Sequence, residues 1–149
     1  MPRVLLALAL FLAAAAPARA WEAKAKNVDA RLKAHPHPMS APQARKPGWA
    51  RKIKDPAAKV HWTERWKGRD YVFGVGLVRG VENSALRVAA AEDRARASLA
   101  DALAAPVETR EGAAPIPEKR VEGILLGSRI LDWYADADGA MYALAVVLP

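Results

Sequence analysis

Few side chains in this sequence of 149 residues are suited to catalysis or to metal binding. There is no cysteine, and the three histidines, His35, His37 and His61, all fall in the first half of the chain. His35 and His37 flank a proline, so their imidazoles could share a metal ion weakly, without a thiolate or a preorganised third ligand. A solvated linker explains the same residues. We therefore predict no metal site and no cofactor.

The possible nucleophiles and acids are no better arranged. Nucleophilic catalysis needs a nucleophile beside a positioned base, and the serines of the second half have no histidine near them in the sequence. Glu92, Asp93 and Asp132 could act as acids or bases, but the first two fall in a helical segment, where a carboxylate is usually solvated. We predict no catalytic residue and a protein that is not an enzyme.

A glycine motif follows a predicted strand, at the place where a nucleotide-binding loop would lie. Gly74, Gly76 and Gly80 depart from the dinucleotide-binding pattern, because Arg79 stands at the third glycine position. The acidic residue expected about 20 positions later, after a second parallel strand, is also missing. The motif is better explained by close packing of the strand and by a turn.

A basic segment that contains tryptophan is the best candidate for a functional surface. Residues 21–70 hold 13 Lys and Arg against five Asp and Glu, whereas residues 71–149 hold eight against 11. Cations attract polyanions, and tryptophan supplies an amphipathic surface. The candidate surface residues are Trp49, Arg51, Lys52, Lys54, Trp62 and Trp66. The alternative is that these tryptophans dock on the segment's own domain. The spacing matches no nucleic-acid-binding module, so nucleic acid is not an expected partner.

The elements that would position these residues are clearest after residue 70. Alternation of large apolar and small residues predicts a strand over 71–79, and residues 84–104 are helix formers throughout. Strands are predicted over 124–134 and 140–148, with Asp138-Gly139 between them as a hairpin turn. The turn also resembles part of a calcium loop, but Tyr134 and Ala145 occupy two of the required ligand positions.

Together these elements predict an α+β domain over 71–149, a small antiparallel sheet with one long helix packed across it. Proline-rich sequence precedes it, so residues 21–70 are predicted to be a largely irregular basic arm. Residues 60–62 could begin an edge strand, and residues 21–34 and 118–123 could form short helices. Alanines spaced three and four apart in the long helix are expected to face Gly74 and Gly76.

The first 20 residues have the pattern of a cleaved secretory signal peptide. A basic start is followed by 13 apolar residues and then by Ala18-Arg19-Ala20, a small-x-small cleavage site before Trp21. The apolar run is shorter than the roughly 20 residues of a membrane-spanning helix, which makes a retained anchor the second choice. We expect an exported protein, periplasmic or secreted, with no transmembrane segment in its mature chain.

Several blocks of sequence occur in an order that suggests a family. They are Pro47-Gly48-Trp49, the strand 71–76, the Ala/Arg-rich helix after Asn83, and the hairpin segments 131–134 and 138–144. In this respect the chain resembles the LPP-twenty lipoprotein family, which is similar to the N-terminal domain of flagellar assembly protein T. The resemblance implies an α+β cell-envelope module without established catalysis. The chain departs from the family's pattern in two ways. It lacks the cysteine for lipid attachment, and its connection before residue 124 is short and rich in proline.

The sequence thus favours an exported, non-enzymatic interaction or structural module of the cell envelope. Its expected partner is an envelope protein or an anionic envelope surface. The alternative is a protein that binds polyanions or envelope surfaces mainly through the basic arm, with the domain acting as a scaffold.

Overall fold

The structure is a computed structural model that describes residues 21–38, 45–104 and 118–149. The predicted signal peptide, residues 1–20, lies outside the described residues. So does most of the proline-rich connection after the long helix. Within the described ranges, no helix is long and apolar enough to cross a membrane.

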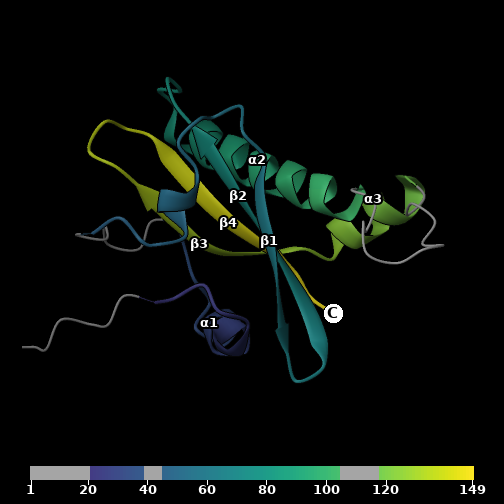
Figure 1. The fold of residues 1–149 in the computed structure, drawn as a ribbon. Coiled ribbons are helices and arrows are strands. Elements are labelled where there is room, and N and C mark those ends of the chain that lie inside the picture. Colours follow the sequence, from purple (N-terminus) through teal and green to yellow (C-terminus); the bar gives the residue numbers. More distant parts are fainter. Residues whose placement is uncertain (1–20, 39–44, 105–117) are drawn as a thin grey trace, which may run out of the picture.

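A four-stranded antiparallel sheet forms the centre of the molecule (Figure 1). Its strands are β1 (Val60–Trp66), β2 (Arg69–Val78), β3 (Arg129–Ala135) and β4 (Met141–Val147). They are ordered β1-β2-β4-β3, so β4 lies between β2 and β3 and is buried on both of its faces. The predicted α+β class, with a small antiparallel sheet and one long helix packed against it, is confirmed.

One long helix, α2 (Ser84–Ala104), has the bounds that the sequence predicts. Asn83 caps its start, because its side-chain oxygen accepts the Leu86 backbone N–H at 3.0 Å. Ala91, Ala95 and Leu99 are fully buried against the sheet, as expected for small and apolar residues on one helical stripe.

The helix approaches the sheet closely at two glycines of β2. A Cβ atom at Gly74 would lie 2.6 Å from the Ala95 carbonyl oxygen, and one at Gly76 would collide with the backbone of Ala91 and Ala95. Neither position leaves room for a side chain, so the glycines are required by packing. This confirms the predicted contact between the glycines and the alanine stripe.

The chain between α2 and the final hairpin differs from prediction. Residues 124–126, predicted as the start of a strand, instead complete α3 (Glu118–Leu126), and β3 begins only at Arg129. A short apolar run fits helix and strand equally well. Here the Ser128 hydroxyl and backbone N–H both donate to the Leu125 carbonyl, which closes the helix before the strand starts. The hairpin turn itself is as predicted, with Gly139 at a φ of 81°.

The segment 21–70 contributes both to the sheet and to a layer on its second face. Residues 60–66 form β1, while η1 (Ala25–Asn27), α1 (Val28–Lys33) and η2 (Ala50–Lys52) lie on the side of the sheet away from α2 (Figure 1). We call residues 21–38 and 45–53 the N-terminal layer. The buried apolar residues of this layer form one cluster with the large side chains of β2 and β4. These layer residues are Ala25, Val28, Trp49, Ala50 and Ile53.

Candidate anion-binding site

A buried carboxylate joins the N-terminal layer to the sheet. Asp132 of β3 is 3% exposed, and its Oδ1 lies 2.6 Å from Nη2 of Arg31. Its Oδ2 accepts the indole N–H of Trp49 at 3.2 Å. Arg31 also donates from Nε to the Leu131 carbonyl at 2.9 Å. Asp132, considered in the sequence as an acid or base, is therefore engaged in holding Arg31 and Trp49 in place.

A register shift in β3 allows this arrangement. The pairing with β4 shifts between Ile130 and Asp132, because Ile130 lies opposite Ala145 while Asp132 lies opposite Leu144. The extra residue, Leu131, packs in the cluster beneath the N-terminal layer. A bulge of this kind redirects side chains. Here it brings a leucine and a carboxylate to the same face in succession.

The anchored layer leaves a hollow of about 550 Å³ at its surface. The walls come from three stretches of chain that are distant in sequence, around residues 21–24, 45–52 and Trp62 of β1. The lining residues are Trp21, Glu22, Ala23, Lys24, Arg45, Lys46, Pro47, Gly48, Trp49, Arg51, Lys52 and Trp62. We call this hollow the basic groove. A second hollow shares Trp21 and Glu22 with it and extends along α1 to Ala34.

The basic groove carries a strong excess of positive charge. Lys24, Arg45, Lys46, Arg51 and Lys52 line it, against the single carboxylate of Glu22. Among the described residues, none of these five cations lies within ion-pair distance of a carboxylate. Within the described ranges, their charges are thus not neutralised by carboxylate side chains.

Aromatic rings hold two of these cations in position. The Lys52 ammonium lies 4.7 Å from the ring centroid of Trp62. The Lys46 ammonium lies 4.3 Å from the ring centroid of Tyr142 and donates to its hydroxyl at 2.7 Å. Tyr142 is fully buried, and Trp62 stacks on buried Phe73 with centroids 5.0 Å apart. Cation–π contacts on fixed rings restrict where the ammonium groups can lie.

The predicted surface residues divide into two groups. Trp49, Arg51, Lys52 and Trp62 line the basic groove, although Trp49 is 2% exposed and serves mainly as its floor. Lys54 is exposed outside the groove. Trp66, 40% exposed at the far end of β1, is also outside it.

Several groove residues were not singled out from the sequence, namely Trp21, Glu22, Lys24, Arg45 and Lys46. A signal for two of them was present. The pairs Arg45-Lys46 and Arg51-Lys52 flank Trp49 almost symmetrically, so a buried tryptophan would carry both pairs to the rim. No local pattern indicates that residues 21–24 fold back against them.

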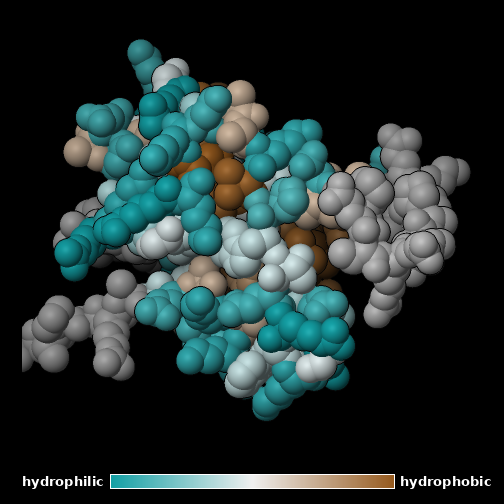
Figure 2. All heavy atoms as spheres, in the orientation of Figure 1, coloured by the Kyte–Doolittle hydropathy of each residue, from teal (hydrophilic) through white to brown (hydrophobic). Residues whose placement is uncertain are grey.

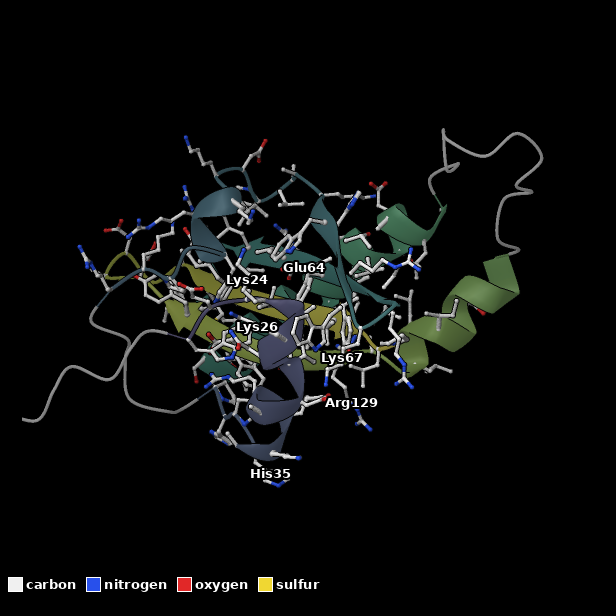
Figure 3. The ribbon with its side chains drawn as sticks, turned by 60° about the horizontal axis from the view of Figure 1, so that its bottom comes forward. Lys24, Lys26, His35, Glu64, Lys67 and Arg129 are labelled. Atoms are coloured by element: carbon white, nitrogen blue, oxygen red, sulfur yellow. The ribbon has the colours of Figure 1, made fainter. Side chains whose placement is uncertain are left out.

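The cationic character continues around the same side of the molecule. Figure 3 shows Lys24 and Lys26 near η1, Lys67 in the β1–β2 turn and Arg129 at the start of β3, all on the side from which α1 projects. Glu64, also labelled there, accepts a hydrogen bond at its Oε2 from the Ala25 backbone N–H, at 2.7 Å. Most of the surface visible in Figure 2 is hydrophilic, with small hydrophobic patches between.

The other candidate reactive groups are placed in structural roles or on the surface. His61 lies 3.1 Å from Asp101, and the Ser98 hydroxyl donates to the Val75 carbonyl. His35 and His37 are exposed after α1. In the part of the chain that the structure describes, no group of three or more His, Asp or Glu side chains could hold a metal ion.

Comparisons with known proteins give no match for this chain, whether with protein-family models, with curated proteins or with solved structures. The likeness to the LPP-twenty family therefore rests on the sequence blocks alone. What the protein does has to be inferred from its own surface, where the basic groove is the most distinctive feature.

Proposed function

We propose that this protein is an exported, non-enzymatic module of the cell envelope that binds an anionic envelope partner through the basic groove. The resemblance to the LPP-twenty family supports the envelope location, as does the signal-like sequence of the first 20 residues. The sequence leaves open an envelope interaction module and a protein that binds polyanions through its basic arm. The proposed protein would be both, because the groove residues of segment 21–70 pack on the sheet of the domain.

The observation that carries the proposal is a set of five cations around one hollow, none of which pairs with a carboxylate of the described residues. Like charges held together destabilise one another when they have no counter-charge. A protein that keeps them beside a hollow of ligand-binding size gains when an anion enters. Exposed carboxylates lie elsewhere on the molecule, for example Asp93 on α2 and Asp138 in the β3–β4 turn. The chain therefore has acidic side chains on its surface but does not place these two beside the groove cations.

The rest of the described surface offers less support for an enzyme. The buried carboxylate is paired with Arg31, and the described residues that line the basic groove include no nucleophile beside a base. Its cations could stabilise developing negative charge, but a reaction also needs groups that move protons or attack the substrate. Binding is the simplest function that uses all the groove residues.

A pair of matched charge variants tests the proposal. In the first, Lys24, Lys46, Arg51 and Lys52 are replaced by Gln. In the second, the exposed residues Lys33, Lys54, Lys67 and Arg69, which lie outside the groove, are replaced by Gln. Both lose four positive charges, so their net charges are equal.

The two variants and the unchanged mature protein are then eluted from a heparin resin with increasing salt. The groove variant should elute at much lower salt than the control variant, because a groove concentrates the attraction on a few contacts. Circular dichroism and thermal unfolding verify that both variants are folded. Equal elution of the two variants would show that only net charge matters, and the proposed function would be abandoned.

A further inference from the structure

We infer that the ligand of the basic groove carries two or more phosphate groups close together. This inference rests on the proposed function and specifies the chemistry of the anion. It follows from the charge density of the groove, from the state of its aromatic rings and from the fixed positions of two of its ammonium groups.

The charge density favours phosphate over carboxylate. Five cations face one carboxylate in a hollow of about 550 Å³. A carboxylate brings one negative charge, whereas a phosphate monoester brings about 1.5 to 2 at neutral pH, together with three acceptor oxygens. Two neighbouring phosphates would therefore nearly neutralise the groove, and few other biological groups supply that much charge in so small a volume.

The aromatic rings argue against a ligand that binds by stacking. Trp62 stacks on Phe73 with an interplanar angle of 12°, and the Lys52 ammonium lies over the same ring at 4.7 Å. Because Trp62 is also half-buried, its contacts with Phe73 and Lys52 take up much of its ring surface. Trp49 is buried. Trp21, the third tryptophan of the lining, has the Arg31 guanidinium 5.3 Å from its ring centroid. All three rings are thus already in contact with protein groups, which makes charge the main means of recognition.

Two ammonium groups are placed before the ligand arrives. Lys46 is held by the ring and hydroxyl of Tyr142, and Lys52 is held over Trp62. Lysine is a compact, strongly charged donor that suits phosphate oxygens. Because long side chains lose conformational freedom on binding, cations that are already ordered lower the cost of association.

Glu22 provides a test with the opposite sign. Its carboxylate lines the basic groove among the cations, so it would repel phosphate while the cations attract it. Replacing Glu22 with Gln should strengthen phosphate binding. Replacing Arg51 with Gln should weaken it. A structural disturbance would weaken binding in both variants.

The experiment is titration calorimetry of the mature protein with inorganic pyrophosphate, orthophosphate and citrate at constant ionic strength. Pyrophosphate should bind at least about tenfold more tightly than citrate, whose similar charge is spread over three carboxylates. Arg51→Gln and Lys46→Gln should each weaken pyrophosphate binding by about tenfold, the loss expected for one charged contact. Glu22→Gln should strengthen it severalfold, and Lys67→Gln should leave it unchanged.

Vesicles identify the source of the phosphates. A lipid with a bisphosphate headgroup is compared with phosphatidylglycerol at equal surface charge. Preference for the bisphosphate lipid indicates a membrane-borne ligand, while pyrophosphate binding without vesicle binding indicates a soluble or polymeric one. Either result agrees with the inference.

The inference is overturned if citrate binds as tightly as pyrophosphate, or if Glu22→Gln and Arg51→Gln change affinity in the same direction. The proposed function survives that outcome if retention on heparin still depends on the groove. If retention is also independent of the groove, both fail.

Discussion

The two faces of the sheet are packed in opposite ways. Toward α2, β2 presents Gly74 and Gly76, and the helix presents alanine, so two backbones come into direct contact. Toward the N-terminal layer, the same strand presents Tyr71 and Phe73, and the partner is a chain of short helical turns held by a buried ion pair. One face consists of regular elements in close contact, and the other of irregular chain fixed at a few polar points.

The difference shows where a surface for binding can arise. Close packing of a regular helix on a sheet leaves little space for a ligand. An irregular layer fixed at Arg31, Trp49 and Ile53 encloses a hollow between its stretches, and its charged side chains point to the rim. The candidate site therefore belongs to the less regular face, as is usual for functional residues carried by connecting segments on a rigid scaffold.

The largest expected effect is on the helix face. Gly76→Val places a branched side chain where even a Cβ meets the backbone of Ala91 and Ala95. Overpacking usually costs about 1–3 kcal/mol. We expect about 3 kcal/mol or more here, because backbone atoms cannot move aside as a flexible side chain can. Chemical denaturation should give the value.

Gly123→Ala is the matched control for that change. A Cβ at Gly123 in α3 meets nothing within 4 Å, and alanine favours a helix by about 1 kcal/mol over glycine. The control should be neutral or slightly stabilising. If Gly76→Val were equally harmless, close contact between helix and sheet would not be what stabilises this face.

The second expected effect is on the layer face. Asp132→Ala removes the partner of Arg31 and the acceptor of the Trp49 indole N–H. Breaking a buried ion pair costs about 3–5 kcal/mol, and the partial exposure of Arg31 places the expected loss near 3 kcal/mol. The basic groove should also lose its shape, so retention on heparin should fall together with stability.

Asp93→Ala, which removes an exposed carboxylate of α2, serves as the control for Asp132→Ala. Its ion pair with Arg96 is solvent-exposed and contributes at most about 1 kcal/mol. Heparin retention of Asp132→Ala is measured under conditions in which the variant is still folded. Unchanged retention would mean that the N-terminal layer forms the groove without the contacts of Asp132 with Arg31 and Trp49.

The same comparison explains what the sequence could predict. The helix face depends on local patterns, since the alanine spacing in 84–104 and the two glycines of 71–79 each follow from a single segment. The layer face depends on contacts between distant residues, such as Arg31 with Asp132 and Trp49 with Asp132, separated by 101 and 83 positions. No local pattern reveals such partners. Four of the six residues chosen as a surface do line the groove, but only the folded chain brings them to Trp21 and Lys24.

A third, smaller effect concerns the tryptophan that connects core and groove. Trp62→Ala removes a half-buried ring that stacks on Phe73 and supports Lys52. Fully buried tryptophans cost about 3–5 kcal/mol when truncated, so we expect about 2 kcal/mol here. Binding of pyrophosphate should weaken as well, because Lys52 loses the ring that orders it. Thermal unfolding and calorimetry measure the two effects on one sample.

The smallest effect is expected from Trp66, four residues further along the same strand. Its ring is 40% exposed and lies outside the groove, and the Lys67 ammonium lies 5.8 Å from its centroid. Trp66→Ala should change stability by less than about 0.5 kcal/mol, as for other exposed positions, and should leave pyrophosphate affinity unchanged.

Tryptophan fluorescence can separate Trp62 from Trp66 in the free protein. Buried Trp49 and half-buried Trp62 should both contribute blue-shifted emission that is protected from a soluble quencher, and Trp62→Ala should reduce this component without abolishing it. The emission of Trp66 should be red-shifted and easily quenched, because its ring faces water. If Trp66→Ala instead reduced the protected component, or weakened pyrophosphate binding as much as Trp62→Ala does, the binding surface would have to extend along β1 to the hairpin. The basic groove would then be only part of the site.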